Sequence, residues 1–199
     1  MIRTEERDGI AVLTIDRPDR ANSLTADMLR GLHDGVDGAR GARMLVLTGA
    51  GTRVFSAGAD LAEARAGLAT SPLWEELSRA VADFPGLSVA ALNGTLAGGA
   101  FGMALACDVR VAVPTATFFY PVASLGFLPQ PSDPVRLAAL VGSARAKLIL
   151  CGGARLDASE ALAFGLVDRI VPDVLAAARD LAVGCADHVA AIKAMVPAG

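Results

Sequence analysis

The sequence predicts a single domain of mixed α/β structure. Short apolar runs rich in β-branched residues alternate along the chain with segments whose apolar residues recur at helical spacing, a pattern typical of alternating strands and helices. The 199 residues are 53% hydrophobic and 20% charged, which is too apolar for disorder and sufficient to bury a core. No linker or shift in composition divides the chain, so we expect residues 1–199 to form one domain.

The first fifty residues predict a strand, a helix and a second strand. Residues 10–15 (IAVLTI) form a β-branched apolar run that ends at a proline-containing turn, so a buried strand is expected to open the fold. Thr25 precedes apolar residues at helical spacing and is the expected N-cap of the helix. Residues 44–48 (MLVLT) predict the next strand, which a glycine-rich turn ends.

The rest of the chain continues the alternation. A helix is expected to begin near Pro72, because proline is favoured in the first turn, and to end before Pro85. The pair Gly98-Gly99 is expected to open an apolar helix that continues to about Ala106. Further strands are expected at residues 88–92, 109–113, 117–119 and 167–171, and further helices at residues 135–141, 144–150, 158–164 and about 174–194.

Composition excludes several classes of partner. The net charge is -3, no run of Lys or Arg occurs, and only 5% of residues are aromatic, so we expect no nucleic-acid partner. Glu5, Glu6 and Asp8 interrupt the N-terminal segment, and no stretch of about 18 uncharged apolar residues exists. We therefore expect no membrane partner and a cytoplasmic location.

The three cysteines predict neither a metal site nor redox chemistry. Cys107, Cys151 and Cys185 are odd in number, lack CxxC spacing and have apolar neighbours. Buried, reduced thiols are the expected interpretation. Nothing in the sequence calls for a metal or an organic cofactor.

Two glycine-rich turns are the first candidates for chemistry. Residues 55–61 (FSAGADL) and residues 93–99 (NGTLAGG) each follow an expected strand, and the second opens a helix. The first N–H groups of a helix have no partner within it and carry positive partial charge, so Gly99 could offer an N–H to a developing oxyanion. The alternative is that the glycines permit tight turns and close packing.

Six segments in this order resemble motifs of the crotonase superfamily, also called the enoyl-CoA hydratase/isomerase family. The resemblance covers nearly the whole chain. Residues 16–24 resemble NRPxxxNAL, residues 45–49 the second strand, residues 55–61 FxAGADL, residues 93–108 NGxxxGGGxELALxCD, residues 116–129 AxFxxPExxLGxxP, and residues 158–167 xAxEAxxxGLVxxVV.

The resemblance implies an α/β fold, a crotonase-like spiral of β-β-α units with C-terminal helices. The core would span about residues 1–150, with a shortened C-terminal helical segment at about 151–199. It also implies an acyl-CoA substrate whose thioester carbonyl is bound by two peptide N–H groups, those of Ala59 and Gly99. The positions that correspond to CoA-binding residues are Arg20, Ala21, Leu24, Ala57, Asp60 and Leu61. No cofactor is implied beyond the CoA that the substrate carries.

The sequence departs from the family at both catalytic glutamates. The positions that hold them are Gly102 and Val122 here, and neither side chain can transfer a proton, so the usual two-glutamate hydration cannot operate. Tyr120 and Asp133 are candidate catalytic replacements. Tyr120 could equally be a half-buried structural residue, and Asp133 could be the N-cap of the helix that contains Pro134.

Two hypotheses about function follow from these residues. In the first, the chain is an enzyme that keeps the oxyanion hole and carries out a different reaction on an acyl-CoA, such as decarboxylation, hydrolysis or isomerisation. In the second, it is a non-catalytic acyl-CoA-binding protein or partner subunit. The resemblance also implies a homo-oligomer, a trimer or a dimer of trimers, with an interface reduced by the short C-terminal segment.

Overall fold

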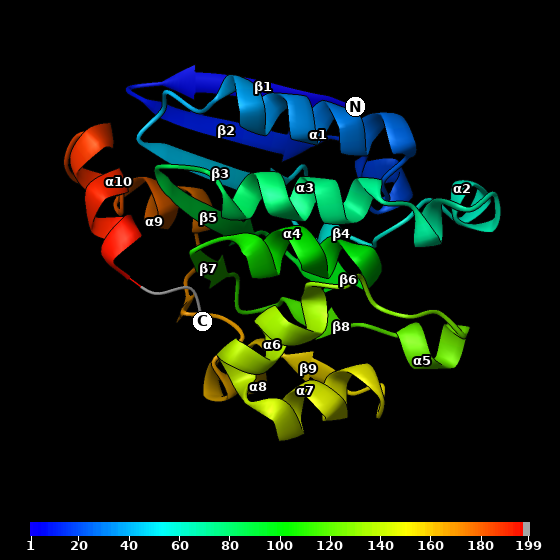
Figure 1. Ribbon diagram of the computed structural model, residues 1–199. Helices are drawn as coiled ribbons and strands as arrows, with labels where there is room; N and C mark the ends of the chain where they lie inside the picture. Colours follow the sequence, from blue (N-terminus) through cyan, green and yellow to red (C-terminus); the bar gives the residue numbers. More distant parts are fainter. Residues whose placement is uncertain (197–199) are drawn as a thin grey trace.

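The computed structural model describes residues 1–196 as two β-sheets covered by helices (Figure 1). The six-stranded sheet has the order β1-β2-β3-β5-β7-β10, and all of its neighbours are parallel except β1 and β2. The four-stranded sheet has the order β4-β6-β8-β9, in which only β8 and β9 are antiparallel. The strands are β1 Ile2–Arg7, β2 Ile10–Ile15, β3 Met44–Gly49, β4 Val54–Ser56, β5 Leu87–Leu92, β6 Thr95–Ala97, β7 Val109–Ala112, β8 Thr117–Phe119, β9 Arg155–Asp157 and β10 Arg169–Ile170.

The chain winds between the two sheets as a spiral. β3, β5 and β7 lie in the larger sheet, each is followed by a strand of the smaller sheet, and helices then return the chain for the next turn. The expected crotonase-like spiral of β-β-α units is therefore confirmed. The helices are α1 Ala26–Gly38, α2 Leu61–Arg65, α3 Leu73–Ala82, α4 Phe101–Ala106, α5 Val122–Leu125, α6 Asp133–Val141, α7 Ser143–Leu150, α8 Ala158–Phe164, α9 Val174–Arg179 and α10 Ala186–Met195.

Alternation along the strands separates two cores. Side chains of successive strand residues point to opposite faces of a sheet, so one strand serves both cores. In β2, Leu13 packs beneath α1, α3 and α4, whereas Val12 faces the side covered by α9. Figure 1 shows α1, α3 and α4 lying across the same face of the larger sheet. Because this sheet is buried on both faces, its central strands are mostly apolar along their length rather than alternating between apolar and polar residues.

Local capping explains where several helices begin. The Thr25 hydroxyl accepts a hydrogen bond from Met28 N at 3.2 Å, as expected for the N-cap of α1. At α8, Asp157 accepts from Glu160 N and the Glu160 carboxylate accepts from Asp157 N, which completes a capping box. Pro72 is the N-cap residue of α3, one position before the helix proper.

The structure corrects four expectations about elements. A strand precedes residues 10–15: β1 gives no sequence signal because all but its first residue are exposed and most are polar or charged. The short strands β4, β6 and β9 are also additions to the expected set. The helix expected at 174–194 is two helices, because the chain turns at Gly184, whose φ is +81°. The strand expected at 167–171 is reduced to β10.

The expectation of three buried thiols is wrong for two of them. Cys107 is buried, and burial raises the pKa of its thiol to about 12. Cys151 and Cys185 are exposed, the first at the end of α7 and the second at the start of α10. Within residues 1–196, no three His, Cys, Asp or Glu side chains gather in a way that would bind a metal ion, and no helix is long and apolar enough to cross a bilayer.

Candidate active site

The two glycine-rich turns predicted from the sequence meet in space. Both follow strands whose carboxyl ends lie at the same edge of the fold. A Cβ placed on Gly58 would lie 3.2 Å from Gly99 N and 3.0 Å from Ala97 O, so the two backbones are in direct contact. Gly58 has a φ of +88° and Gly98 a φ of +59°, conformations that favour glycine. The glycines therefore serve both the close approach and the turn geometry.

The direction of the Ala59 N–H follows from its pairing with Leu24. The two residues form an isolated parallel bridge in which Leu24 N donates to Gly58 O and Asp60 N donates to Leu24 O, each at 2.8 Å. In such a pair the bonds come from the neighbours of Ala59, so its own N–H points away from Leu24. No turn or loop hydrogen bond within residues 1–196 uses Ala59 N as donor.

Gly99 supplies the second backbone N–H. It is the second residue of the 3₁₀ turn Gly98–Ala100 that leads into α4, and the first N–H groups of a helical segment lack partners within it. Gly99 is half-buried, so this N–H is not sealed in the core. Behind it lies the indole of Trp74, whose ring atoms would be 3.3 Å from a Cβ at position 99. Trp74 is itself fixed by a hydrogen bond from its Nε1 to Leu68 O at 2.8 Å.

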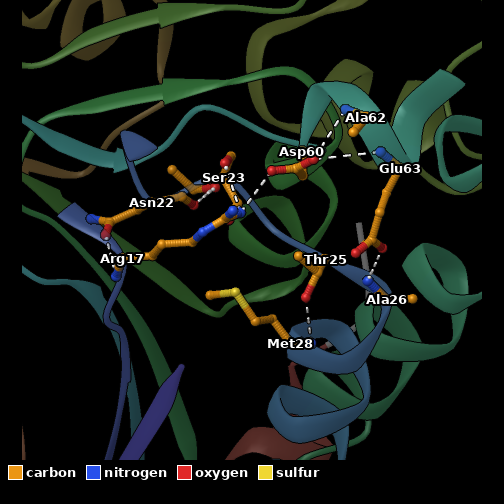
Figure 2. A network of polar contacts seen from close by, with 10 residues as sticks. Arg17, Asn22, Ser23, Thr25, Ala26, Met28, Asp60, Ala62 and Glu63 are labelled. Carbon is orange, nitrogen blue, oxygen red and sulfur yellow. Dashed lines mark hydrogen bonds and ion pairs between the residues drawn. The ribbon is translucent and has the colours of Figure 1, made fainter. Parts of the chain in front are cut away.

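An ion pair holds the Ala59 turn in place (Figure 2). Arg17 Nη1 lies 2.8 Å from Asp60 Oδ2 and also donates to the Ser23 hydroxyl at 3.2 Å. Asp60 Oδ1 accepts from Ala62 N at 3.0 Å and so caps α2. The hydrogen bond from Arg17 lowers the pKa of the Asp60 carboxyl, which keeps it ionised. The turn is thus tied to the segment that precedes α1.

A second carboxylate extends this network. The Glu63 side chain in α2 accepts a hydrogen bond from Ala26 N, the first residue of α1, at 2.7 Å (Figure 2). A carboxylate at this position satisfies a free N–H and interacts favourably with the helix dipole. Together with the Thr25 cap, it fixes α1 and α2 relative to each other.

Asp133 and Tyr120 form a buried pair next to α4. The Tyr120 hydroxyl donates to Asp133 Oδ2 at 2.7 Å, and the Tyr120 ring stacks on Phe101 with centroids 5.2 Å apart. Asp133 has no exposed surface and Tyr120 is 2% exposed. Burial raises the pKa of the Asp133 carboxyl from 3.8 to about 6, and burial also raises the pKa of Tyr120. Tyr120 is therefore a neutral donor.

This pair corrects two interpretations of the sequence. Asp133 is the first residue of α6, but it is not the N-cap: that position belongs to Ser132, which makes no side-chain capping bond. The Asp133 side chain turns inward to Tyr120 instead. Tyr120 is fully rather than half buried, because its hydroxyl finds a partner inside the protein.

Gly102, where the resemblance would place a glutamate, lies against the Asp133 carboxylate. A Cβ on Gly102 would be 2.9 Å from Asp133 Oδ1 and 2.6 Å from Ser78 Oγ. The carboxylate of Asp133 therefore lies next to the position that the Cβ atom of a larger residue at position 102 would occupy. Gly102 follows Gly99 by three residues, about one helical turn, so the carboxylate lies one turn along α4 from the Gly99 N–H.

The residues expected to bind CoA differ in how far their side chains are exposed. The side chains of Arg20, Ala57 and Leu61 are exposed, and Leu61 is 77% exposed. Ala21 is half-buried and has a left-handed backbone, with a φ of +51°. Leu24 has no exposed surface: its side chain belongs to the core. The carboxylate of Asp60 forms an ion pair with Arg17.

Comparisons with known proteins place the fold in a family. The family model described as Enoyl-CoA hydratase/isomerase matches residues 5–198. The chain belongs to the enoyl-CoA hydratase/isomerase family. A Rhodobacter capsulatus protein named "Probable enoyl-CoA hydratase" is 37% identical over 210 residues, which covers 100% of this chain and 81% of that protein.

Two solved structures illustrate the similarity of the fold. The structure of Pseudomonas aeruginosa DspI has a TM-score of 0.88 and 34% identity, with 98% of this chain and 85% of that chain covered. An enoyl-CoA hydratase from Bacillus anthracis has a TM-score of 0.84 and 31% identity, with 91% and 74% covered. The crotonase-like fold predicted for this chain is thus the fold of these relatives.

Three residues of the site are not identified by the sequence patterns. Arg17 is predicted only as part of a turn, and Trp74 only as part of a helix. Ser78 lies four residues after Trp74 on the buried face of α3, where a lone polar residue among apolar ones is a usable signal. The partners of Arg17 and Ser78 are distant in sequence, and spacing alone does not reveal them.

Proposed function

We propose that this member of the family is an enzyme that acts on an acyl-CoA thioester through an oxyanion hole and a single carboxylate. The N–H groups of Ala59 and Gly99 bind the thioester oxygen, and Asp133 moves the proton. The observation that carries the proposal is the arrangement of these groups: the turns that hold Ala59 and Gly99 are in backbone contact, and a carboxylate with a raised pKa lies about one helical turn away. No cofactor is needed beyond the CoA of the substrate.

The chemistry follows from charge. Asp133 removes a proton from the carbon next to the thioester carbonyl, the electron pair of the broken C–H bond forms the C=C bond of an enolate, and the π pair of the carbonyl moves onto its oxygen. The two N–H groups stabilise the resulting enolate, a contribution of a few kcal/mol for such donors. A carboxylate with a pKa of about 6 suits proton transfer near neutral pH, because it is largely ionised and still basic. Tyr120 holds the carboxylate in place.

Proton exchange tests this function whatever the final product of the reaction is. Butyryl-CoA is incubated with the protein in deuterium oxide, and deuterium gained next to the carbonyl is measured by mass spectrometry. We expect exchange in the wild type and at least about a hundredfold less with Asp133→Asn, which keeps the shape but removes the base. Asp27→Asn, on the exposed face of α1, is the matched control. Equal exchange in Asp133→Asn and wild type would contradict the proposal.

A second candidate is a non-catalytic acyl-CoA-binding protein or partner subunit. The observation that favours it is burial: Asp133 has no exposed surface, and Trp74, behind Gly99, is 3% exposed. It predicts that titration calorimetry detects butyryl-CoA binding while exchange is absent from the wild type. Exchange that depends on Asp133 would exclude it.

A further inference from the structure

Two buried oxygens without partners lie beside the same glycine. Within residues 1–196, three buried side-chain polar atoms lack a hydrogen bond: Ser78 Oγ, Asp133 Oδ1 and Arg43 Nε. The first two are the atoms nearest to a Cβ on Gly102. A buried polar group without a partner is costly and uncommon. Two at one place indicate that the structure can satisfy them together.

The two oxygens lie around the same point of the structure. They lie 2.6 Å and 2.9 Å from one point, the Cβ position of Gly102, so their separation cannot exceed the sum of those distances. Ser78 is 1% exposed and lies on α3, whereas Asp133 begins α6. Rotation of Ser78 about χ1 moves its hydroxyl between staggered positions without moving the helix. A Cβ at position 102 would crowd both groups, so one of the two side chains would have to move to admit it.

The charged groups around Asp133 leave Oδ1 in need of a donor. On Oδ2, Tyr120 provides one hydrogen bond. Glu75 of α3 raises the pKa of Asp133 and Arg136 of α6 lowers it, so these two charges oppose each other. The Arg136 guanidinium is engaged with the Ser132 hydroxyl at 2.8 Å. An ionised Asp133 therefore has one oxygen bound and one free, with the Ser78 hydroxyl beside the free one.

We propose that Ser78 is a positioning residue for Asp133: when the carboxyl ionises, the Ser78 hydroxyl turns and donates a hydrogen bond to Oδ1. Tyr120 then holds Oδ2 and Ser78 holds Oδ1, so the carboxylate is fixed between two neutral donors. When Asp133 is protonated, the Ser78 hydroxyl is released. The pairing is a property of the protein without substrate, and its effect on turnover rests on the proposed function.

A carboxyl titration tests the pairing directly. The Asp133 carboxyl is followed by carbon-13 NMR against pH in the wild type, Ser78→Ala and Ser78→Cys. Loss of a donor to the ionised form should raise the pKa of Asp133 by about one unit in Ser78→Ala, and by less in Ser78→Cys, whose thiol is a weak donor of similar size. Ser124→Ala removes an exposed hydroxyl bound to Pro121 O and should change nothing. An unchanged pKa in both Ser78 variants would overturn the inference.

Deuterium exchange separates this inference from the proposed function. In Ser78→Ala, the pH dependence of butyryl-CoA exchange should move upward by the same amount as the NMR titration, while the affinity for butyryl-CoA stays unchanged. If the pKa of Asp133 shifts in Ser78→Ala but neither the wild type nor any variant exchanges deuterium, the Ser78 pairing is supported and the proposed function is contradicted. If the wild type exchanges deuterium but Ser78→Ala alters neither the Asp133 titration nor the pH profile of exchange, the proposed function is supported and the Ser78 pairing is contradicted.

Discussion

Asp133 is a carboxylate placed where ionisation is costly. It has no exposed surface, one hydroxyl partner and an opposing pair of charges nearby. Its pKa is raised, so the folded protein binds more protons than the unfolded chain between about pH 4 and pH 6. Stability must therefore fall as pH rises through that window. A group kept at such a cost is typical of functional sites.

The first prediction concerns this cost. Asp133→Asn should raise the free energy of unfolding at neutral pH, by up to about 3 kcal/mol if the whole pKa difference is recovered. The gain should disappear below about pH 4, where the carboxyl is protonated in both the folded and unfolded states. Urea denaturation across this pH range measures it. A variant that is less stable than wild type at every pH would show that Asp133 is needed for structure instead.

Tyr120 gives the second prediction. Tyr120→Phe keeps the ring that stacks on Phe101 and removes only the hydroxyl that donates to Asp133. Because that hydrogen bond favours the ionised form, the pKa of Asp133 should rise further. The NMR titration should move to higher pH by about one unit or more. If the pKa of Asp133 in Tyr120→Phe equals that in the wild type, the Tyr120 hydroxyl does not stabilise the ionised carboxylate.

For single residues, the sequence predicts which residues belong to the candidate site better than it predicts the contacts that they make. Ala59 and Gly99 can be named as candidates because motifs fix their positions, and Tyr120 and Asp133 because they lie near position 122, where the family's second glutamate is missing. The inward turn of Asp133 cannot be predicted, because a capping role for an aspartate next to proline is locally favourable. Only the Tyr120 hydroxyl, thirteen residues earlier, decides against it. The place of Ser78 on the buried face of α3 marks it as unusual, but its role cannot be predicted, because the residues next to its hydroxyl come from α4 and α6.

Among the elements, α1 and α2 hold the Ala59 turn through side chains rather than through their own packing. The Arg17–Asp60 ion pair ties the turn to the segment before α1, and Glu63 caps α1 from α2. Arg17 and Asp60 are half-buried, so this pair is screened somewhat less than a fully exposed one. A donor that must be positioned precisely relative to an oxyanion benefits from such fixing, because a misplacement of about 1 Å can cost a hundredfold in rate.

The third prediction follows from this network. Arg17→Gln should slow butyryl-CoA exchange by roughly tenfold or more, because the Ala59 turn loses its ion pair with the segment before α1. Arg30→Gln breaks an exposed pair with Asp27 of similar length, 2.9 Å, and is the control, for which we expect no effect on exchange. Equal exchange rates in the two variants would argue against a positioning role for Arg17.

The elements predicted correctly share one property: their signal is local. β2, β3, β5, α1 and α8 carry β-branched runs or caps in their own residues. β4 and β6 have three residues each, too few for periodicity, and form only because the spiral brings them together. The break between α9 and α10 depends on one glycine in a polar-apolar mixture that also suits a continuous helix.

In the molecule as a whole, the cavity that the described residues form lies away from the candidate site. The candidate site lies where the strands of the spiral end, around Gly58 and Gly99. A separate cavity of about 860 Å³ lies near the starts of β3 and β5, between α6 and α10. Exposed apolar side chains also occur in and after α5, where Leu125 and Leu128 are 62% and 85% exposed. Such surfaces are compatible with an oligomer.

The fourth prediction is the assembly. We expect a homo-oligomer, a trimer or a dimer of trimers, so light scattering coupled to size exclusion should give three or six times the chain mass. Exposed apolar side chains near α5 are the observation in favour. A single-chain mass at all protein concentrations would contradict the prediction.

The measurement that tests the oxyanion hole most directly is infrared difference spectroscopy of butyryl-CoA carrying carbon-13 at the thioester carbonyl. If the N–H groups of Ala59 and Gly99 both bind the oxygen, the carbonyl band must move to lower frequency on binding, because both donors polarise the bond. The shift should persist in Asp133→Asn, which leaves the two donors intact. A band that is unchanged when the ligand is bound would contradict the oxyanion hole and, with it, the proposed enzyme.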